Sequence, residues 1–231
     1  MSRPIEAAPR LLRTIPLIGM RATIARRMTQ SLRDSAQVTL NTSLDPQALI
    51  AFRARLRQSV EYTQVTYNDL IVLAVARTLP AHQMLNATVQ GELVSIWESI
   101  NVGIAVSLEE GLVVPVIQEC ARRTLAEISA AARDLGARAR EGRLGMSDVL
   151  GGTFTVSNLG AFGVDHFTPI INPPQVAILG VGRIAHTLTL SLTIDHRAVD
   201  GARGAQFLSA LATTLEDPAV NLSLGRPAGE C

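Results

Sequence analysis

Residues 187–194 read TLTLSLTI and run directly into residues 195–201, DHRAVDG. The first segment alternates polar and apolar residues without a break, which predicts a half-buried β-strand. After residue 201, apolar residues recur at the spacing of a helix. They are Phe207, Leu208, Leu211 and Leu215. We therefore expect a strand, a short turn and a helix, with His196 in the turn and Asp200 at the start of the helix.

The histidine in this turn points to proton transfer, because histidine has an ordinary pKa of about 6.5 and exchanges a proton near neutral pH. Polar surface loops also contain histidine and aspartate at this spacing without any chemical role. The spacing of His196 and Asp200 therefore leaves both interpretations open, and Asp200 is also suited to capping the helix.

The longer pattern, Asp-His-Arg-x-x-Asp-Gly, resembles the signature of the dihydrolipoamide acyltransferases, the core subunits of 2-oxoacid dehydrogenase complexes. Four further blocks resemble the same family in the right order, which is far more specific than any single motif. They are GMRATIARRM at 19–28, NVGIAV with GLVVPV at 101–106 and 111–116, GTFTVSNLG at 152–160, and INPPQVAILG at 171–180.

This resemblance implies an α+β fold like that of chloramphenicol acetyltransferase, with a mixed, mostly antiparallel sheet flanked by helices. Runs of strands interrupted by a few helices indicate the same class. We expect residues 1–18 to be a proline-containing linker or N-terminal arm, 19–224 to be the acyltransferase catalytic domain, and 225–231 to be a C-terminal tail. The resemblance also implies a homotrimer, which in some members assembles into a cubic or dodecahedral core.

Local patterns predict the elements around these blocks. Apolar spacing predicts a helix from Gly19, and the all-apolar run at 70–76 predicts a buried helix. Helix starts are expected at Asp45-Pro46, Thr66-x-x-Asp69 and Thr124-x-x-Glu127. Strands are expected at 38–44, 93–97, 100–107, 112–117, 153–157 and 176–181.

The chemistry of the family makes demands that these residues can meet. A thiol with an ordinary pKa near 8.5 is mostly protonated at pH 7, so its attack on a thioester needs a general base. The resemblance implies that His196 is this base. It also implies that Ser157, in the Phe-Thr-x-Ser block, donates a hydrogen bond to the oxyanion of the tetrahedral intermediate. In the family, the histidine and the serine of one site come from neighbouring subunits.

The same resemblance implies that Asp200 is an orienting residue, which pairs with an arginine and shapes the active-site turn. Arg21, in the first family block, is the expected partner, because an unpaired buried carboxylate is costly and arginine can form a bidentate pair. We therefore expect Asp200→Asn and Arg21→Ala to damage both stability and turnover.

Composition argues against other classes of protein. The 231 residues carry a formal net charge of +1, which argues against a nucleic-acid-binding protein. No apolar run reaches the roughly 18 residues of a membrane span, and no histidine–cysteine cluster has zinc spacing, so we expect neither membrane nor metal. Cys120 and Cys231 give no disulfide framework and suit a reducing cytoplasm. Residues 180–185, GVGRIA, imitate a dinucleotide fingerprint, but a period-two segment follows where that site needs a helix.

We interpret the chain as an acyltransferase, of acetyl or branched-chain type, that moves an acyl group between dihydrolipoamide and coenzyme A in a 2-oxoacid dehydrogenase complex. Its 21 basic residues are all arginine, so the lipoyl group must come from another domain or chain. The lipoyl domain and the dehydrogenase components are the expected partners. Arginines cluster at 26–27, 53–57 and 133–143, and one of these clusters could bind the phosphates of coenzyme A, although the sequence does not show which. Two alternatives stay open: a stand-alone acyl-CoA-dependent enzyme of the chloramphenicol acetyltransferase type, and a non-catalytic assembly scaffold.

Overall fold

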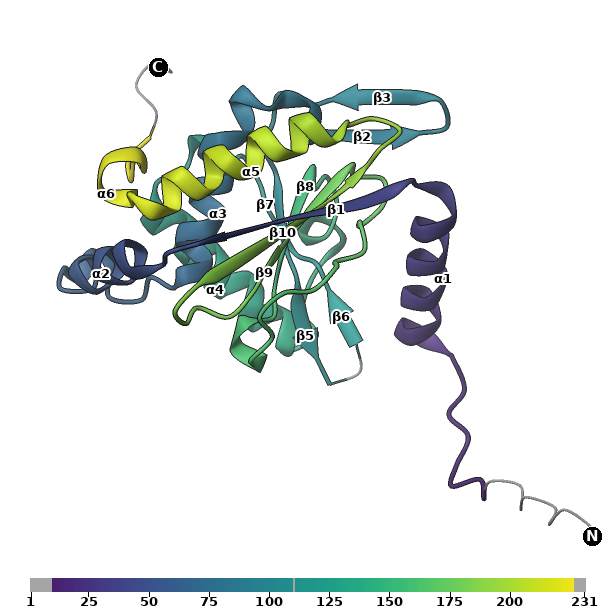
Figure 1. Cartoon of the computed structure of the whole chain (residues 1–231). Coiled ribbons are helices and arrows are strands. Elements are labelled where there is room, and N and C mark those ends of the chain that lie inside the picture. The colour runs from purple at the N-terminus through teal and green to yellow at the C-terminus, as the bar shows by residue number, and fades with distance from the viewer. Residues whose placement is uncertain (1–9, 110, 227–231) are drawn as a thin grey trace, which may run out of the picture.

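A mixed sheet forms the centre of the computed structural model, which describes residues 10–109 and 111–226. Its strands follow the order β1-β10-β9-β8-β4-β7 (Figure 1). The neighbours β1–β10, β10–β9 and β4–β7 are antiparallel, whereas β9–β8 and β8–β4 are parallel. The predicted mixed, mostly antiparallel sheet is thus confirmed. The strands are β1 (Gln37–Leu44), β10 (Leu188–Asp195), β9 (Ala177–Val181), β8 (Phe154–Asn158), β4 (Val102–Ile104) and β7 (Val116–Ile117).

Helices and two short hairpins surround this sheet. One hairpin pairs β2 (Ala87–Gln90) with β3 (Leu93–Ile96), and the other pairs β5 (Val106–Leu108) with β6 (Gly111–Val113). The helices are α1 (Gly19–Asp34), α2 (Gln47–Leu56), α3 (Tyr67–Thr78), α4 (Leu125–Arg140), α5 (Gly201–Glu216) and α6 (Pro218–Asn221). None of the described helices is long and apolar enough to cross a membrane.

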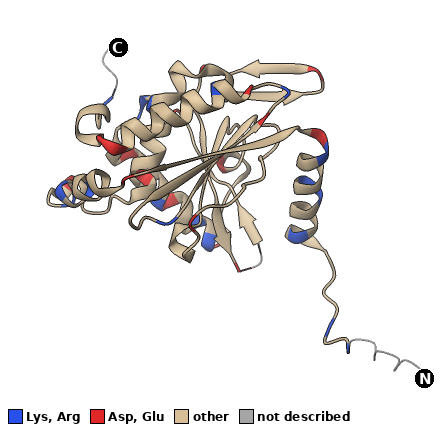
Figure 2. Ribbon diagram, in the orientation of Figure 1, with Lys and Arg blue, Asp and Glu red and all other residues tan. Residues whose placement is uncertain are grey.

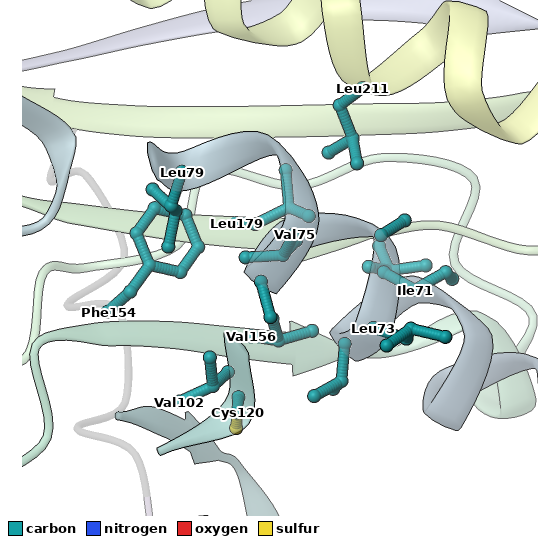
Figure 3. Packing of buried hydrophobic residues seen from close by; sticks show 14 of the residues in the cluster. Ile71, Leu73, Val75, Leu79, Val102, Cys120, Phe154, Val156, Leu179 and Leu211 are labelled. Atoms are coloured by element: carbon teal, nitrogen blue, oxygen red, sulfur yellow. The ribbon is translucent and has the colours of Figure 1, made fainter. Parts of the chain in front are cut away.

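Helix α3 is the buried helix that the sequence predicts. Every residue from 70 to 76 is fully inaccessible to solvent, and Ile71 and Val75 pack among side chains from the sheet and α5 (Figure 3). A capping box starts the helix, since the Asp69 amide donates to Thr66 Oγ1 at 3.2 Å and the Thr66 amide donates to Asp69 Oδ2 at 2.8 Å. Such reciprocal capping satisfies two of the orphan donors of a helix N-terminus.

Strand β10 is more deeply buried than its alternating sequence predicts. Its apolar residues face the helical core, yet Ser191 and Thr193 on the other face are also buried. The strand lies between β1 and β9, and the hydroxyls of Thr193 and Thr39 satisfy each other at 2.8 Å. The half-buried prediction is therefore wrong, because polar residues of a central strand can be covered when they pair across strands.

Other elements also differ from the sequence prediction. Strand β2 is not anticipated, because its four residues are short and follow a one-turn helix. The expected strand at 100–107 is divided at Ala105, where the chain leaves β4 for the β5–β6 hairpin. The expected strand at 112–117 is also divided, because residues 114 and 115 separate β6 from β7. Helix α2 starts one residue later than expected, with Pro46 in the cap position, although Asp45 Oδ1 still accepts from the Gln47 amide at 2.9 Å.

The ends of the chain bear on the expected domain boundaries. Residues 10–18 have no regular secondary structure and are exposed, and α1 begins at Gly19. The predicted arm at 1–18 and tail at 225–231 otherwise fall on residues 1–9 and 227–231, which lie outside the described residues. Arg77 donates to the Gly225 carbonyl at 2.7 Å and so ties the last described residues to α3.

Candidate active site

His196 lies in a tight turn between β10 and α5. Its side chain is exposed, whereas its backbone amide donates to the Ala36 carbonyl at 2.8 Å. The Ala198 amide donates to the Asp195 carbonyl at 2.9 Å and closes the turn. The predicted strand, turn and helix are confirmed here, and the imidazole projects from a fixed backbone.

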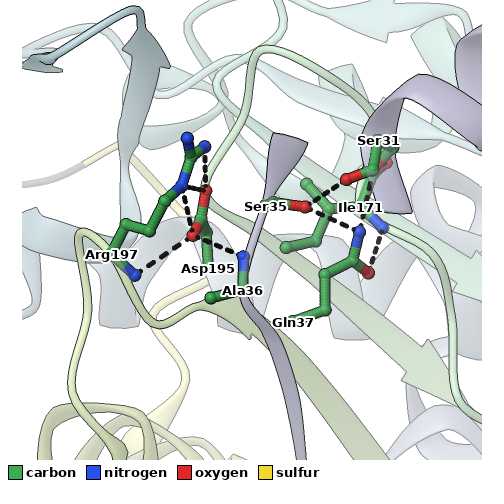
Figure 4. Close-up of polar contacts among 7 residues, drawn as sticks. All are labelled: Ser31, Ser35, Ala36, Gln37, Ile171, Asp195 and Arg197. Atoms are coloured by element: carbon green, nitrogen blue, oxygen red, sulfur yellow. Dashed lines mark hydrogen bonds and ion pairs between the residues drawn. The ribbon is translucent and has the colours of Figure 1, made fainter. Parts of the chain in front are cut away.

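The carboxylate beneath this turn belongs to Asp195 and is buried (Figure 4). The Arg197 guanidinium donates to Oδ2 at 2.6 Å through Nη2, and its Nε lies 3.0 Å from each oxygen. The backbone amides of Arg197 and Ala36 add bonds to Oδ1 of 3.1 and 3.2 Å. Burial alone would raise the pKa of Asp195, but the hydrogen bonds and charge of Arg197 outweigh it and lower that pKa below its ordinary value.

Asp200 is the N-cap of α5. Its Oδ1 accepts from the Arg203 amide at 2.9 Å, and its Oδ2 lies 3.4 Å from Nε of the same arginine. Both groups are largely exposed, so the pair contributes little beyond the cap itself, about 1 kcal/mol. The capping alternative for Asp200 is thus confirmed.

Arg21 is not the partner of Asp200 among the residues that the structure describes, and this prediction is corrected to Arg203. Arg21 lies in the first turn of α1, a helix with several basic residues (Figure 2). Its neighbours Met20 and Ile24 pack against Gly111 of β6. That end of α1 is the one farther from α5 (Figure 1). A cap also needs only one acceptor oxygen, which asparagine supplies as well, so the structure gives no reason for Asp200→Asn to be severe.

Ser157 lies near the end of β8 and is half-buried in a cleft of about 950 Å³. Tyr67 from the start of α3 and Phe162 from the loop after β8 also line this cleft. The loop packs tightly on the end of β9, because a Cβ on Gly182 would lie 1.8 Å from the Asp165 carbonyl oxygen. Only glycine fits at that contact, which holds the loop that follows Ser157 in place.

Arginines also line this cleft. Arg133 and Arg140 from α4 and Arg183 after β9 all line it. Their neighbours Arg138 and Arg143 are instead neutralised by carboxylates, Arg138 by Asp148 and Asp134, and Arg143 by Glu141. No ion pair joins Arg133 or Arg140 to a carboxylate within the described ranges, so two cations of the cluster are available to an anionic ligand.

Within one chain, Ser157 and His196 lie at opposite ends of the sheet. Ser157 is opposite Gly180 on β9, and Gly180 is opposite Ser191 on β10. His196 follows Ser191 by five residues, so at roughly 3.3 Å per residue it is on the order of 17 Å farther along the sheet. The structure therefore brings His196 and Asp200 into one turn but does not bring either of them to Ser157.

The sequence analysis did not single out Asp195, although the sequence contains a signal for it. Asp195 shares the strand face of Ser191 and Thr193, opposite to that of Ile194, which is why its carboxylate points under the turn and is buried. Asp200 lies beyond the turn and caps a helix that faces solvent at this end. Segment β10, which follows the GVGRIA sequence, is a strand, so the geometry of a dinucleotide site is absent there.

Known proteins resemble this chain over most of its length. The dihydrolipoyllysine-residue acetyltransferase component of the acetoin cleaving system of Bacillus subtilis is 42% identical over 221 residues, which cover 89% of this chain and 56% of that protein. The chain spans about half the length of the curated relatives it matches. The core of the pyruvate dehydrogenase multienzyme complex, a cubic assembly, superimposes with a TM-score of 0.85 at 29% identity, covering 94% of this chain and 99% of that one.

A second solved structure bears on the candidate residues. The dihydrolipoamide acetyltransferase of Azotobacter vinelandii superimposes with a TM-score of 0.85 at 29% identity, covering 94% of this chain and 99% of that one. That enzyme was studied for the roles of a serine, a histidine and an asparagine in its catalytic mechanism, the asparagine following the histidine by four residues. Asp200 follows His196 at the same spacing.

Two further comparisons concern the fold and the family. Chloramphenicol acetyltransferase matches with a TM-score of 0.52 at 13% identity, which supports the fold alone. A model of the family described as 2-oxoacid dehydrogenases acyltransferase (catalytic domain) matches residues 10–223. The chain that places His196 in this turn and Ser157 in this cleft therefore belongs to the 2-oxoacid dehydrogenase acyltransferase family, as a catalytic domain.

Proposed function

We propose that this chain transfers an acetyl group between a dihydrolipoyl arm and coenzyme A, as the core of a 2-oxoacid dehydrogenase complex. The observation that carries the proposal is the separation of His196 and Ser157 by the length of the sheet, each in a setting suited to one half of an acyltransfer site. A site that needs both is completed only when the His196 turn of one subunit meets the Ser157 cleft of another.

The proposed chemistry uses each side chain once. His196 takes the proton of the attacking thiol, and the thiolate adds to the thioester carbonyl. The resulting oxyanion accepts a hydrogen bond from Ser157 Oγ of the neighbouring subunit. When the intermediate collapses, the original thioester carbon–sulfur bond breaks and His196 returns the proton to the leaving thiolate. The reaction is balanced and needs no redox step or metal.

The unpaired arginines of the Ser157 cleft support coenzyme A as one thiol substrate. Its phosphates are anions, and charge-assisted hydrogen bonds from guanidinium groups are the strong ones. Arg133 and Arg140 are the residues that we assign to these phosphates, and they supply the cofactor contacts that the sequence alone did not identify.

Removing either charge should weaken binding of coenzyme A more than it slows the reaction. We expect Arg133→Gln and Arg140→Gln each to raise the KM for coenzyme A about tenfold, the equivalent of roughly 1.4 kcal/mol, with kcat within about twofold. Arg143→Gln is the matched control, because Arg143 is exposed and already paired with Glu141. An unchanged KM in both cleft variants would remove these two arginines from the substrate site.

Steady-state assays with dihydrolipoamide and a panel of acetyl-, succinyl- and isobutyryl-CoA test the proposed reaction. We expect turnover with dihydrolipoamide, at the highest kcat/KM for acetyl-CoA, since the related proteins are acetyltransferases. Turnover with other acceptors but not with dihydrolipoamide would favour a stand-alone acyl-CoA enzyme. No turnover with any acceptor would favour an assembly scaffold.

The proposed assembly is a homotrimer with a shared site at each subunit interface, built in turn into a larger core. The cubic core of the similar pyruvate dehydrogenase structure supports this order of assembly. Lipoyl domains and the dehydrogenase components are the proposed partners, because the chain has no lysine to carry a lipoyl group. We place the complex in a reducing compartment such as the cytoplasm, in keeping with the buried free thiol of Cys120.

A further inference from the structure

We infer that Asp195 is a positioning residue for His196: its buried carboxylate, paired with Arg197, fixes the backbone from which the imidazole projects. The inference rests on the proposed function, in which His196 is the general base. It assigns this role to the carboxylate that precedes the histidine, and leaves Asp200 as the helix cap.

The Asp195 carboxylate holds both the residue that follows His196 and the segment to which the His196 amide is bonded. Oδ1 accepts from the Arg197 amide at 3.1 Å, which forms a turn with His196 at its centre. The same oxygen accepts from the Ala36 amide at 3.2 Å, while the Ala36 carbonyl accepts from the His196 amide at 2.8 Å. One carboxylate thus connects the residue after His196 to Ala36, which directly precedes β1.

Arg197 makes this arrangement stable in a buried place. A lone carboxylate would lose its hydration there, whereas the guanidinium supplies a two-point contact, from Nη2 to Oδ2 at 2.6 Å and from Nε to Oδ1 at 3.0 Å. A hydrogen-bond network reinforces the adjoining segment, in which Ser31 Oγ donates to the Ile171 carbonyl at 2.7 Å and Gln37 Nε2 donates to Ser31 Oγ at 2.9 Å (Figure 4). The end of α1, the start of β1 and the catalytic turn therefore form one connected unit.

A shared site makes this rigidity matter. The His196 side chain is exposed in the single chain, so the backbone of the turn sets the point from which the imidazole reaches the substrate and the neighbouring subunit. An error of about 1 Å in the position of a catalytic group can cost about a hundredfold in rate. Loss of the Asp195 contacts should hence appear in kcat, and the KM values should change little.

The variant Asp195→Asn tests this role in the assembled protein, assayed with acetyl-CoA and dihydrolipoamide below its unfolding temperature. We expect kcat to fall by roughly 10- to 100-fold with both KM values within about twofold. In the His196→Ala background, Asp195→Asn should cause no further loss, because Asp195 acts only through His196. A residue with a merely structural role would reduce the remaining activity again.

Asp148→Asn is the matched control for a lost arginine pair. Asp148 also accepts two hydrogen bonds from one guanidinium, that of Arg138, at 2.6 and 3.0 Å, and it lies outside both parts of the proposed site. We expect it to change kcat less than twofold. Should Asp195→Asn fail to fold, Arg197→Lys keeps a cation but loses the two-point contact and should lower kcat about fivefold to tenfold.

The outcomes separate this inference from the proposed function. A folded Asp195→Asn variant with the wild-type kcat, alongside an inactive His196→Ala variant, overturns the positioning role and leaves the proposed function standing. A wild-type protein without turnover, or a fully active His196→Ala variant, overturns both, since Asp195 then has no base to position.

Discussion

Replacing His196 by alanine is expected to lower kcat for acetyl transfer by about 10³- to 10⁴-fold, because the attacking thiol loses its general base. The fold should be unaffected, since the imidazole is exposed and the hydrogen bond to Ala36 comes from the backbone amide, which alanine retains. Steady-state kinetics with dihydrolipoamide, together with thermal unfolding of the same preparation, measure both effects.

His186→Ala is the control for this experiment. His186 is also exposed and lies in the connection between β9 and β10, so it is at the opposite end of β10 from His196. We expect its kcat to stay within about twofold of the wild-type value. Near-full activity in a folded His196→Ala variant would exclude His196 as the base, whatever the role of its neighbours.

The position of His196 in a turn could be predicted from the sequence, because neighbouring residues encode the strand, turn and helix around it. Alternation along 187–194 predicts the strand, helical spacing predicts α5, and the turn between them places His196. Capping boxes at Thr66 and Thr124 are equally local and are confirmed. Features of this kind need no knowledge of what packs against them.

The roles of the two aspartates could not be separated in the same way. Asp195 and Asp200 both flank the histidine, and their difference depends on which one has a buried face and a nearby partner. The Asp195 carboxylate accepts a hydrogen bond from Ala36, which directly precedes β1 and lies 159 residues earlier in the chain. The Asp200 carboxylate caps a helix, and its partner among the described residues is Arg203. Pairing with Arg21 was inferred from the resemblance and from the cost of an unpaired buried carboxylate, but the Asp200 carboxylate is largely exposed and pairs with Arg203.

Ser157 illustrates a third case, in which the residue is found from sequence but its partner is outside the chain. The block at 152–160 predicts the serine at the end of a strand, and the structure has it near the end of β8. The register of β8, β9 and β10 then separates it from His196 within one chain. No local pattern encodes this distance, because it arises from the order and direction of three strands.

Ser157→Ala is expected to lower kcat by about 10²- to 10³-fold, or roughly 3 kcal/mol, with little change in KM, because a donor to the oxyanion acts mainly in the transition state. Because Ser157 is only half-buried, the variant should fold normally. An unchanged turnover number would remove Ser157 from the site.

The sharper test combines the two inactive chains. If each site takes His196 from one subunit and Ser157 from the next, then His196→Ala and Ser157→Ala subunits co-assembled in equal amounts restore about one site in four. Sites contained within one chain would restore none. As a control, wild-type subunits co-assembled with the His196→Ala/Ser157→Ala double variant should give about a quarter of the wild-type activity for shared sites and about half for sites within one chain. The sheet register favours the quarter in both experiments, because His196 and Ser157 of a single chain are too far apart to act on one thioester.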